Sequence, residues 1–201
     1  MTNDIELNAL IGSRICHDLI SPLGAIGNGV ELLAMTGAES TPEIMLISES
    51  VENANARIRY FRVAFGAATE GTMIGNSEVC SIIGDLFKAT NRVAVDWRVS
   101  DDISRAEAKL VFLIILCFES ALPWGGKVLV TRTGGRWNLM GSGERLKIDE
   151  ALWDVVANPQ YDTKMSASDV QFALVQPAAR AIERRVTTII RMRSRLGFSA
   201  G

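Results

Sequence analysis

The feature that most constrains the fold is a run of apolar residues whose spacings alternate between three and four. Its members are Ile44, Ile47, Val51, Ala54, Ile58, Phe61 and Phe65. This spacing places all of them on one stripe of an α-helix, as at the seam of a coiled coil or helical bundle. Thr41 suits the N-cap of this helix and Pro42 its first turn. The sequence therefore predicts a long bundle helix that begins near residue 42.

A second amphipathic helix precedes the first one in the chain. Its apolar residues return about every 3.6 positions and are Leu7, Ile11, Ile15, Leu19, Ile26, Val30 and Leu33. The short segment GAESTPE separates the two helices, so they are expected to form a hairpin. A hairpin buries one seam and leaves other apolar surface exposed. We therefore expect residues 1–70 to pair with a second copy in a dimeric four-helix bundle.

Residues 71–201 follow a Gly-rich boundary, GAATEGTMIGNSE, and have a different periodicity. Helices are expected over residues 79–89, 104–122, 149–157 and 169–186, and strands over 93–99, 127–133, 136–141 and 187–193. Gly134 and Gly135 fit the turn of a hairpin between two of these strands. Helices stacked on strands give an α/β sandwich, so the whole chain is assigned to the α+β class.

The composition excludes several classes of protein. The formal net charge is −2 and 48% of the residues are hydrophobic, so no basic surface indicates nucleic acid as a partner. The N-terminus lacks the pattern of a signal peptide, and the longest apolar run, residues 110–118, is too short for a bilayer. We therefore expect a soluble cytoplasmic protein with no membrane partner. Cys16, Cys80 and Cys117 have no close pairing, so neither a structural metal nor a disulfide framework is expected.

The single histidine of the chain, His17, lies in the first predicted helix but off its apolar stripe. Ile20, Ser21 and Gly24 share its face, because residues three, four and seven positions apart lie above one another on a helix. A neutral imidazole is a nucleophile when an acceptor holds the proton on its other nitrogen. Asp18 is the nearest candidate acceptor. Pro22 removes a helical hydrogen bond and is expected to kink the helix beside the histidine.

Glycines and arginines surround this position in ways that suggest a partner surface. Gly24, Gly27 and Gly29 each cost about 0.8–1 kcal/mol relative to alanine inside a helix. Gly24 leaves bare backbone on the histidine face, where another protein can approach closely. If the interhelical loop is centred near residue 39, residue 61 lies opposite His17. Three arginines bracket that level, namely Arg57, Arg59 and Arg62, and they are able to bind phosphoryl groups or acidic surfaces.

The stretch HDLISPL resembles the phosphoacceptor box of sensor histidine kinases. The longer string HDLISPLGAIGNGVELL, together with YFRVAFGAA at the end of the second helix, is similar to the ChpT-type histidine phosphotransferases. This resemblance implies a homodimer whose C-terminal domain resembles the ATPase (Bergerat) domain of the kinases. It also implies that this domain has lost the ability to bind ATP.

The nucleotide-binding motifs of such a kinase are replaced in this sequence. Leu116 and Ser120 occupy the positions of the two asparagines that hold magnesium and phosphates, and Leu139 occupies the position of the aspartate that recognises adenine. An aliphatic side chain accepts no hydrogen bond from the adenine amino group. KMSASD stands where the kinases have a glycine-rich lid. Gly141 and Gly143, which match the glycines of the turn that carries the adenine-recognising aspartate, remain. The sequence therefore predicts no ATP and no stably bound cofactor.

The resemblance implies a phosphorelay in which His17 accepts a phosphoryl group from a receiver aspartate and passes it to another. Asp18 would orient the imidazole and Ser21 would face the phosphoryl group. Ile20 and Gly24, with Arg59 and Arg62 on the second helix, are expected to bind the receiver. The donor would be the receiver domain of a hybrid histidine kinase and the acceptors response regulators. Mg²⁺ is expected to be bound by the receiver, since this chain has no cluster of carboxylates that would bind it.

Two alternatives remain open at this stage. One is a degenerate histidine kinase that still uses ATP, and the other is a non-catalytic dimeric scaffold that binds receivers without carrying phosphate. Reverse transfer, which drains phosphate through the residue matching Ser21, is a further possibility within the leading interpretation.

Overall fold

The computed structural model describes residues 4–35, 41–90, 92–158, 165–191 and 195–200. The chain divides into two compact units, Met1–Ala67 and Ala68–Gly201. The boundary predicted between residues 70 and 71 lies in the segment that follows the second helix.

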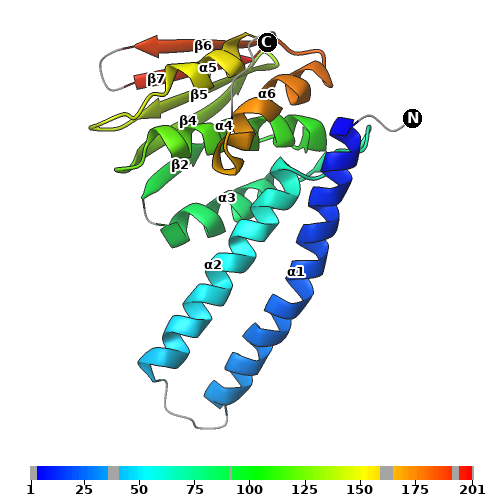
Figure 1. Ribbon diagram of the computed structural model, residues 1–201, viewed down its shortest axis with the longest axis vertical. Helices are drawn as coiled ribbons and strands as arrows, with labels where there is room; N and C mark the ends of the chain where they lie inside the picture. Colours follow the sequence, from blue (N-terminus) through cyan, green and yellow to red (C-terminus); the bar gives the residue numbers. More distant parts are fainter. Residues whose placement is uncertain (1–3, 36–40, 91, 159–164, 192–194, 201) are drawn as a thin grey trace. The chain divides into compact units, whose positions relative to one another are not determined.

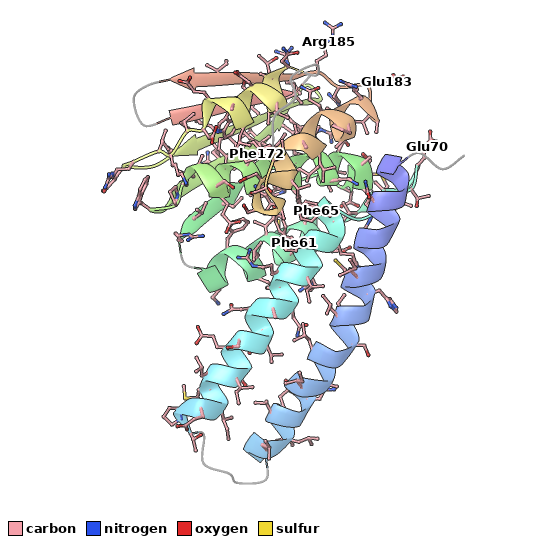
Figure 2. All side chains as sticks on the ribbon, in the orientation of Figure 1. Phe61, Phe65, Glu70, Phe172, Glu183 and Arg185 are labelled. Carbon is pink, nitrogen blue, oxygen red and sulfur yellow. The ribbon has the colours of Figure 1, made fainter. Side chains whose placement is uncertain are left out.

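The first unit is a hairpin of two helices, α1 (Asp4–Met35) and α2 (Pro42–Ala64) (Figure 1). The predicted start of α2 is confirmed, because the Thr41 hydroxyl accepts a hydrogen bond from the backbone N–H of Ile44 at 3.4 Å and Pro42 occupies the first turn. Near the C-terminal end of α2, the rings of Phe61 and Phe65 meet edge to face with centroids 5.2 Å apart (Figure 2).

Two glycines show how closely the helices approach and fix their antiparallel register. A Cβ atom on Gly12 would lie 3.4 Å from the backbone oxygen of Phe65, and one on Gly27 would lie 3.4 Å from Cγ1 of Val51. Counting five residues forward from Gly12 and five back from Phe65 places Tyr60 at the level of His17. This level is one residue from the one expected from the sequence.

The predicted apolar stripe of α1 is not the face that packs inside the hairpin. Cys16 and Val30 are each 8% exposed, whereas four stripe residues are 46–54% exposed in the single chain: Ile15, Leu19, Ile26 and Leu33. Along α2, Val51 of the predicted seam is buried, but the other buried residues, Ala56, Tyr60, Val63 and Ala64, lie off that seam. Hydrophobic periodicity identifies an apolar face and does not specify which partner covers it.

The second unit contains a mixed five-stranded sheet in the order β2-β4-β5-β7-β6. Its strands are β2 (Val93–Trp97), β4 (Gly126–Thr133), β5 (Arg136–Ser142), β6 (Val186–Arg191) and β7 (Arg195–Ala200). The pair β2 and β4 is parallel, and the other pairs are antiparallel. The predicted hairpin is confirmed, with Gly134 and Gly135 at positive φ in its turn. A small second sheet pairs β1 (Met73–Ile74) with β3 (Ile103–Ser104).

Helices cover one face of the five-stranded sheet and complete the α/β sandwich expected from the sequence (Figure 1). They are α3 (Asn76–Thr90), α4 (Arg105–Ala121), α5 (Glu150–Ala157) and α6 (Val170–Arg180), with a short 3₁₀ turn at Ala167–Asp169. Residues 110–118 of α4 are all buried, so this helix is the centre of the core. In the described part of the chain, no helix combines the length and the apolar character needed to cross a bilayer.

Two predictions near the C-terminus are corrected. The helix expected over residues 169–186 ends at Arg180, and the chain turns through Glu183, whose φ of 54° lies in the left-handed region. The final strand expected over residues 187–193 corresponds to β6 (Val186–Arg191), which begins one residue earlier, and residues 192 and 193 lie outside the described residues. Strand β7 was not anticipated, although it pairs with both β5 and β6.

Candidate functional site

The candidate site centres on His17, which is exposed on α1. The preceding residue, Cys16, points into the hairpin and is 8% exposed. Adjacent residues of a helix point in different directions, so the imidazole of His17 points outward. Ser21 is also exposed, and Ile20 is half-buried. Gly24 has no atom within 4 Å of the place where a Cβ would stand. The face predicted for His17, Ile20, Ser21 and Gly24 is therefore accessible in the hairpin.

Helix α1 continues without interruption through Asp18 and Pro22. The side chains of these two residues lie outside the described part of the structure. The expected contact between the Asp18 carboxylate and the imidazole, and the expected kink at Pro22, therefore stay predictions.

Three arginines of α2 lie within one turn of Tyr60, the residue at the level of His17. Arg59 and Arg62 are exposed and Arg57 is half-buried, with its guanidinium 5.9 Å from the centre of the Phe61 ring. Burial raises the pKa of the Cys16 thiol, and the positive charge of Arg62 partly opposes this rise. Arg62 is thus within electrostatic reach of the residue next to His17.

In the second unit, the residues that replace the kinase motifs take part in the packing of the core. Leu116 is 6% exposed and Leu139 is 1% exposed. The Ser120 hydroxyl donates to the Leu116 carbonyl at 3.2 Å and accepts a hydrogen bond from Nε2 of Gln171, on α6, at 3.1 Å. A Cβ on Gly141 would lie 2.5 Å from the Phe118 ring, so this glycine is explained by close packing of β5 on α4.

Aromatic rings pack between the helices of this unit. The Trp153 ring of α5 lies 5.8 Å from that of Phe118 and 5.5 Å from that of Phe172, measured between centroids. Neither of two pockets in the described part of this unit is lined by Leu116, Ser120 or Leu139. Among the described residues, no three histidine, cysteine, aspartate or glutamate side chains gather as metal ligands would.

Sequence reasoning missed two residues that organise these units. Tyr60 is fully buried at the level of His17, and its position one residue before the predicted seam gave no signal of this. Glu107 is 8% exposed and lies between Arg132 and Arg184, at 3.0 and 3.3 Å. The pattern Ser104-x-x-Glu107 is a capping-box signature that was available in the sequence, and both of its hydrogen bonds are present.

Comparison with known proteins identifies the class to which this fold and site belong. The model of the histidine phosphotransferase C-terminal domain matches residues 76–192. The protein phosphotransferase ChpT of Brucella abortus (strain 2308) is 31% identical over 173 residues, which cover 83% of this chain and 82% of that protein. The chain therefore belongs to the histidine phosphotransferase family, and its similarity to ChpT agrees with the type expected from the first helix.

Solved structures support the same assignment. A bacterial phosphotransferase structure covers 100% of this chain and 98% of its own, with 27% identity and a TM-score of 0.72. Full-length ShkA, solved in complex with AMPPNP, covers 94% of this chain and 45% of its own, with 16% identity and a TM-score of 0.50. The second likeness concerns the fold alone.

Proposed function

We propose that this protein carries a phosphoryl group between the aspartates of two receiver domains and that His17 holds the group between the two transfers. The proposal rests on one observation. The chain belongs to the histidine phosphotransferase family, and its single histidine, His17, is exposed on α1 with Ser21 and Gly24 on the same face. The donor is the receiver domain of a hybrid histidine kinase, and the acceptors are response regulators.

The chemistry requires one nucleophile and no cofactor of its own. The unprotonated imidazole nitrogen attacks the phosphorus of the receiver phosphoaspartate; a P–N bond forms while the acyl P–O bond breaks and the aspartate leaves as a carboxylate. The second transfer reverses these bonds, with an aspartate carboxylate of the acceptor as nucleophile. Positioning and charge neutralisation account for most catalysis in phosphoryl transfer. Mg²⁺ supplied by the receiver would provide much of this neutralisation.

Side chains next to His17 assist by orientation. Asp18 accepts a hydrogen bond from the N–H of the imidazole and so directs the other nitrogen toward the receiver. Ser21 lies one turn further along the same face and meets the phosphoryl group. The same hydroxyl is suited to position a water for phosphate release, which would allow the relay to drain as well as to fill.

The phosphoryl group comes from a receiver and not from ATP. The buried Leu116 and Leu139 support this part of the proposal, since they stand at the sequence positions where the kinases have a magnesium-binding asparagine and the aspartate that recognises adenine. Incubation with radiolabelled ATP alone should leave the protein unlabelled, whereas incubation with a radiolabelled phosphoreceiver should label it. Calorimetry should detect no saturable binding of ATP at millimolar concentration.

The outcomes of this experiment separate the competing interpretations. Labelling of His17 by ATP alone would establish a degenerate kinase. Stable binding of the phosphoreceiver without transfer of label would establish a scaffold. Transfer from the phosphoreceiver, together with no labelling by ATP, is the result that the proposal requires.

The hairpin should act as an obligate homodimer with a four-helix bundle at its centre. Ile15, Leu19, Ile26 and Leu33 expose an apolar stripe on α1, and Met45, Leu46 and Ile47 are 45–64% exposed near the start of α2. Exposed apolar surface of this kind is typical of an interface. Multi-angle light scattering at micromolar concentration should give twice the chain mass. A monomeric mass would contradict the proposal.

The receiver is proposed to bind the face that carries Ile20 and Gly24, extending to Arg59 and Arg62. The half-buried Ile20 offers an apolar anchor one turn from His17, and open space at Gly24 allows a partner helix to approach the backbone. The two exposed arginines match the acidic pocket of a receiver.

Gly24→Leu should therefore lower the rate of transfer steeply, by about tenfold or more, because a leucine in the docking path costs well over 1.4 kcal/mol of binding. The melting temperature should change little, since no atom lies within 4 Å of the new Cβ. Glu31→Leu is the matched control, because it places the same side chain two turns further along the same face. Equal rates for Gly24→Leu and wild type at subsaturating receiver would show that docking occurs elsewhere.

A further inference from the structure

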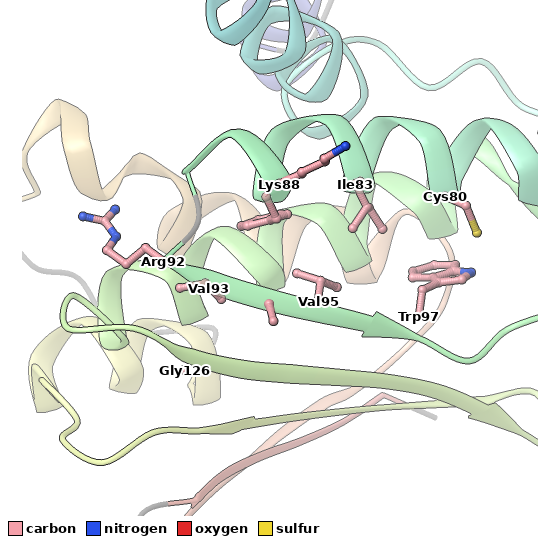
Figure 3. A pocket seen from close by; sticks show the side chains of 11 residues that line it. Cys80, Ile83, Lys88, Arg92, Val93, Val95, Trp97 and Gly126 are labelled. Carbon is pink, nitrogen blue, oxygen red and sulfur yellow. The ribbon is translucent and has the colours of Figure 1, made fainter. Parts of the chain in front are cut away.

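A groove of about 550 Å³ runs between α3 and β2 in the second unit, and none of the residues assigned to phosphotransfer lines it (Figure 3). Ile83 and Phe87 line it from the helix, and Val95 and Trp97 line it from the strand. Its character is therefore mainly apolar. Figure 3 shows Cys80 and Trp97 at one end of the groove and Arg92 at the other.

Strand β2 borders this groove with a free edge. Among the described strands it pairs with β4 alone. The Arg92 carbonyl accepts from the Gly126 N–H at 3.2 Å and the Arg98 N–H donates to the Val130 carbonyl at 2.9 Å, so both residues direct their backbone groups toward β4. Successive residues of a strand direct these groups to opposite sides. Val93, Val95 and Trp97 therefore present their N–H and C=O groups on the free edge, where an added strand can pair.

Gly84 lines the same groove from the middle of α3. No atom lies within 4 Å of its missing Cβ, so packing inside this chain does not require a glycine. Its place in a helix interior costs about 1 kcal/mol relative to alanine. The bare backbone leaves room for another chain to approach.

A second hollow, of about 860 Å³, adjoins the Arg92 end of the groove, because Arg92 and Gly126 line both. Trp124 is 59% exposed there, and the Arg145 guanidinium lies 4.7 Å from the centre of its ring. Lys127 adds a third cation to the lining, against one carboxylate, Glu144. Arg92 and Lys127 also meet Glu119 and Asp96, at 3.5 and 2.9 Å, so the hollow is moderately and not strongly basic.

We propose that this surface binds an extended peptide segment of a partner protein, with apolar residues in the groove and acidic residues in the hollow. The segment adds a strand to the free edge of β2, and alternate side chains enter the space between Ile83, Phe87 and Val95. An antiparallel segment carries its acidic residues C-terminal to the apolar ones, because the hollow lies at the N-terminal end of β2. This site is independent of His17, so it would bring the partner to the protein without taking part in phosphoryl transfer.

The test uses the full-length protein and a fluorescein-labelled synthetic peptide, Val-Thr-Val-Thr-Gly-Glu-Glu-Asp. Saturable fluorescence anisotropy should report binding. A second peptide with two adjacent residues of the first four replaced by proline should bind about tenfold more weakly or not at all, because it lacks an N–H for pairing in either register. Cys80 is exposed in the groove whereas Cys16 and Cys117 are buried, so the first peptide should also slow alkylation of Cys80 by N-ethylmaleimide.

Gly84→Leu should weaken binding of the first peptide about tenfold or more, while the fold keeps or gains stability because leucine is the better helix former. Ser81→Leu is the matched control: it adds the same side chain to an exposed position of α3 outside the groove and should bind as wild type does. Absence of saturable binding to wild type at millimolar peptide, or equal weakening by the two variants, would overturn the proposal. A change of oligomeric mass in Gly84→Leu would show that a second copy of the chain occupies the groove, and would overturn it as well.

Discussion

His17→Ala should abolish phosphoryl acceptance from every phosphorylated receiver. The chain contains a single histidine, so no second imidazole can replace it as the nucleophile. The expected loss is complete and not graded, because the intermediate itself can no longer form. Transfer of radiolabel from a phosphoreceiver, followed on gels under conditions that preserve phosphohistidine, measures this directly.

The variant should keep the fold and mass of the wild type, because the His17 side chain is exposed and its removal opens no cavity in the hairpin. Circular dichroism and light scattering provide the control. Binding of an unphosphorylated receiver should also persist, since docking is assigned to Ile20, Gly24 and the arginines of α2. Acid-labile, base-stable label on His17→Ala would disprove the assignment of the phosphoacceptor.

The helical hairpin was predictable from sequence because its signals are local. The Thr41 cap, Pro42 and the run of spacings that alternate between three and four required no knowledge of distant residues. The face that packs inside the hairpin was not predictable in the same way. Gly12 and Gly27 make the close helix contacts, and glycines carry no hydrophobic signal, so the apolar stripe that includes Ile15 and Leu19 does not reveal which face of α1 packs inside the hairpin.

The second unit shows the same division between local and distant information. Alternating side chains and a Gly-Gly turn were sufficient to predict the hairpin of β4 and β5. Strand β7 was missed because its residues, RLGFSA, include few β-formers and depend on pairing with β5 and β6. The end of α6 was misplaced because the apolar pattern continues beyond Arg180, whereas the backbone turns at Glu183.

For the candidate site, the sequence indicated the residue type and the structure supplied the surroundings. His17, Ser21 and Gly24 were chosen from helical spacing, and all three are accessible on α1. Arg62 was predicted to lie near His17 on the assumption that the interhelical loop is centred near residue 39. Burial raises the pKa of the thiol of Cys16, the residue next to His17, and the positive charge of Arg62 partly opposes this rise. The burial of Tyr60 at the same level depends on tertiary packing and has no counterpart in the local pattern.

Glu107 is the clearest example of a contact that local sequence patterns do not reveal. Its carboxylate accepts hydrogen bonds from Nε1 of Trp137 at 3.2 Å and from Arg132 at 3.0 Å, and it also accepts from the backbone N–H of Ser104 at 3.3 Å. Arg184 donates to the same carboxylate and to the Gly135 carbonyl. One buried acid thus connects the start of α4 to the hairpin of β4 and β5 and to the segment before β6. None of these long-range partners is visible from sequence spacing.

Glu107→Ala should destabilise the second unit by roughly 3–5 kcal/mol, because it leaves two arginines without their carboxylate in a largely buried place and also removes the capping box. Glu107→Gln should cost less, since the amide keeps one acceptor oxygen. Asp96→Asn is the matched control. Asp96 also lies between two cations, Arg98 at 3.0 Å and Lys127 at 2.9 Å, but both cations are more than half exposed, so its replacement should lower the melting temperature much less.

The effect of Glu107 should also depend on pH with a defined sign. Desolvation raises the pKa of the Glu107 carboxyl, but the hydrogen bond from Trp137 and the charge of Arg132 outweigh it and hold the pKa below its ordinary value of 4.5. A lowered folded-state pKa gives stability that is complete above the unfolded-state pKa and is lost as pH falls through the folded-state pKa. In urea titrations, the difference in unfolding free energy between wild type and Glu107→Gln should therefore be constant near neutral pH and shrink below pH 4.5. A difference that stayed constant into acid would mean that Glu107 stabilises the fold through packing and not through its charge.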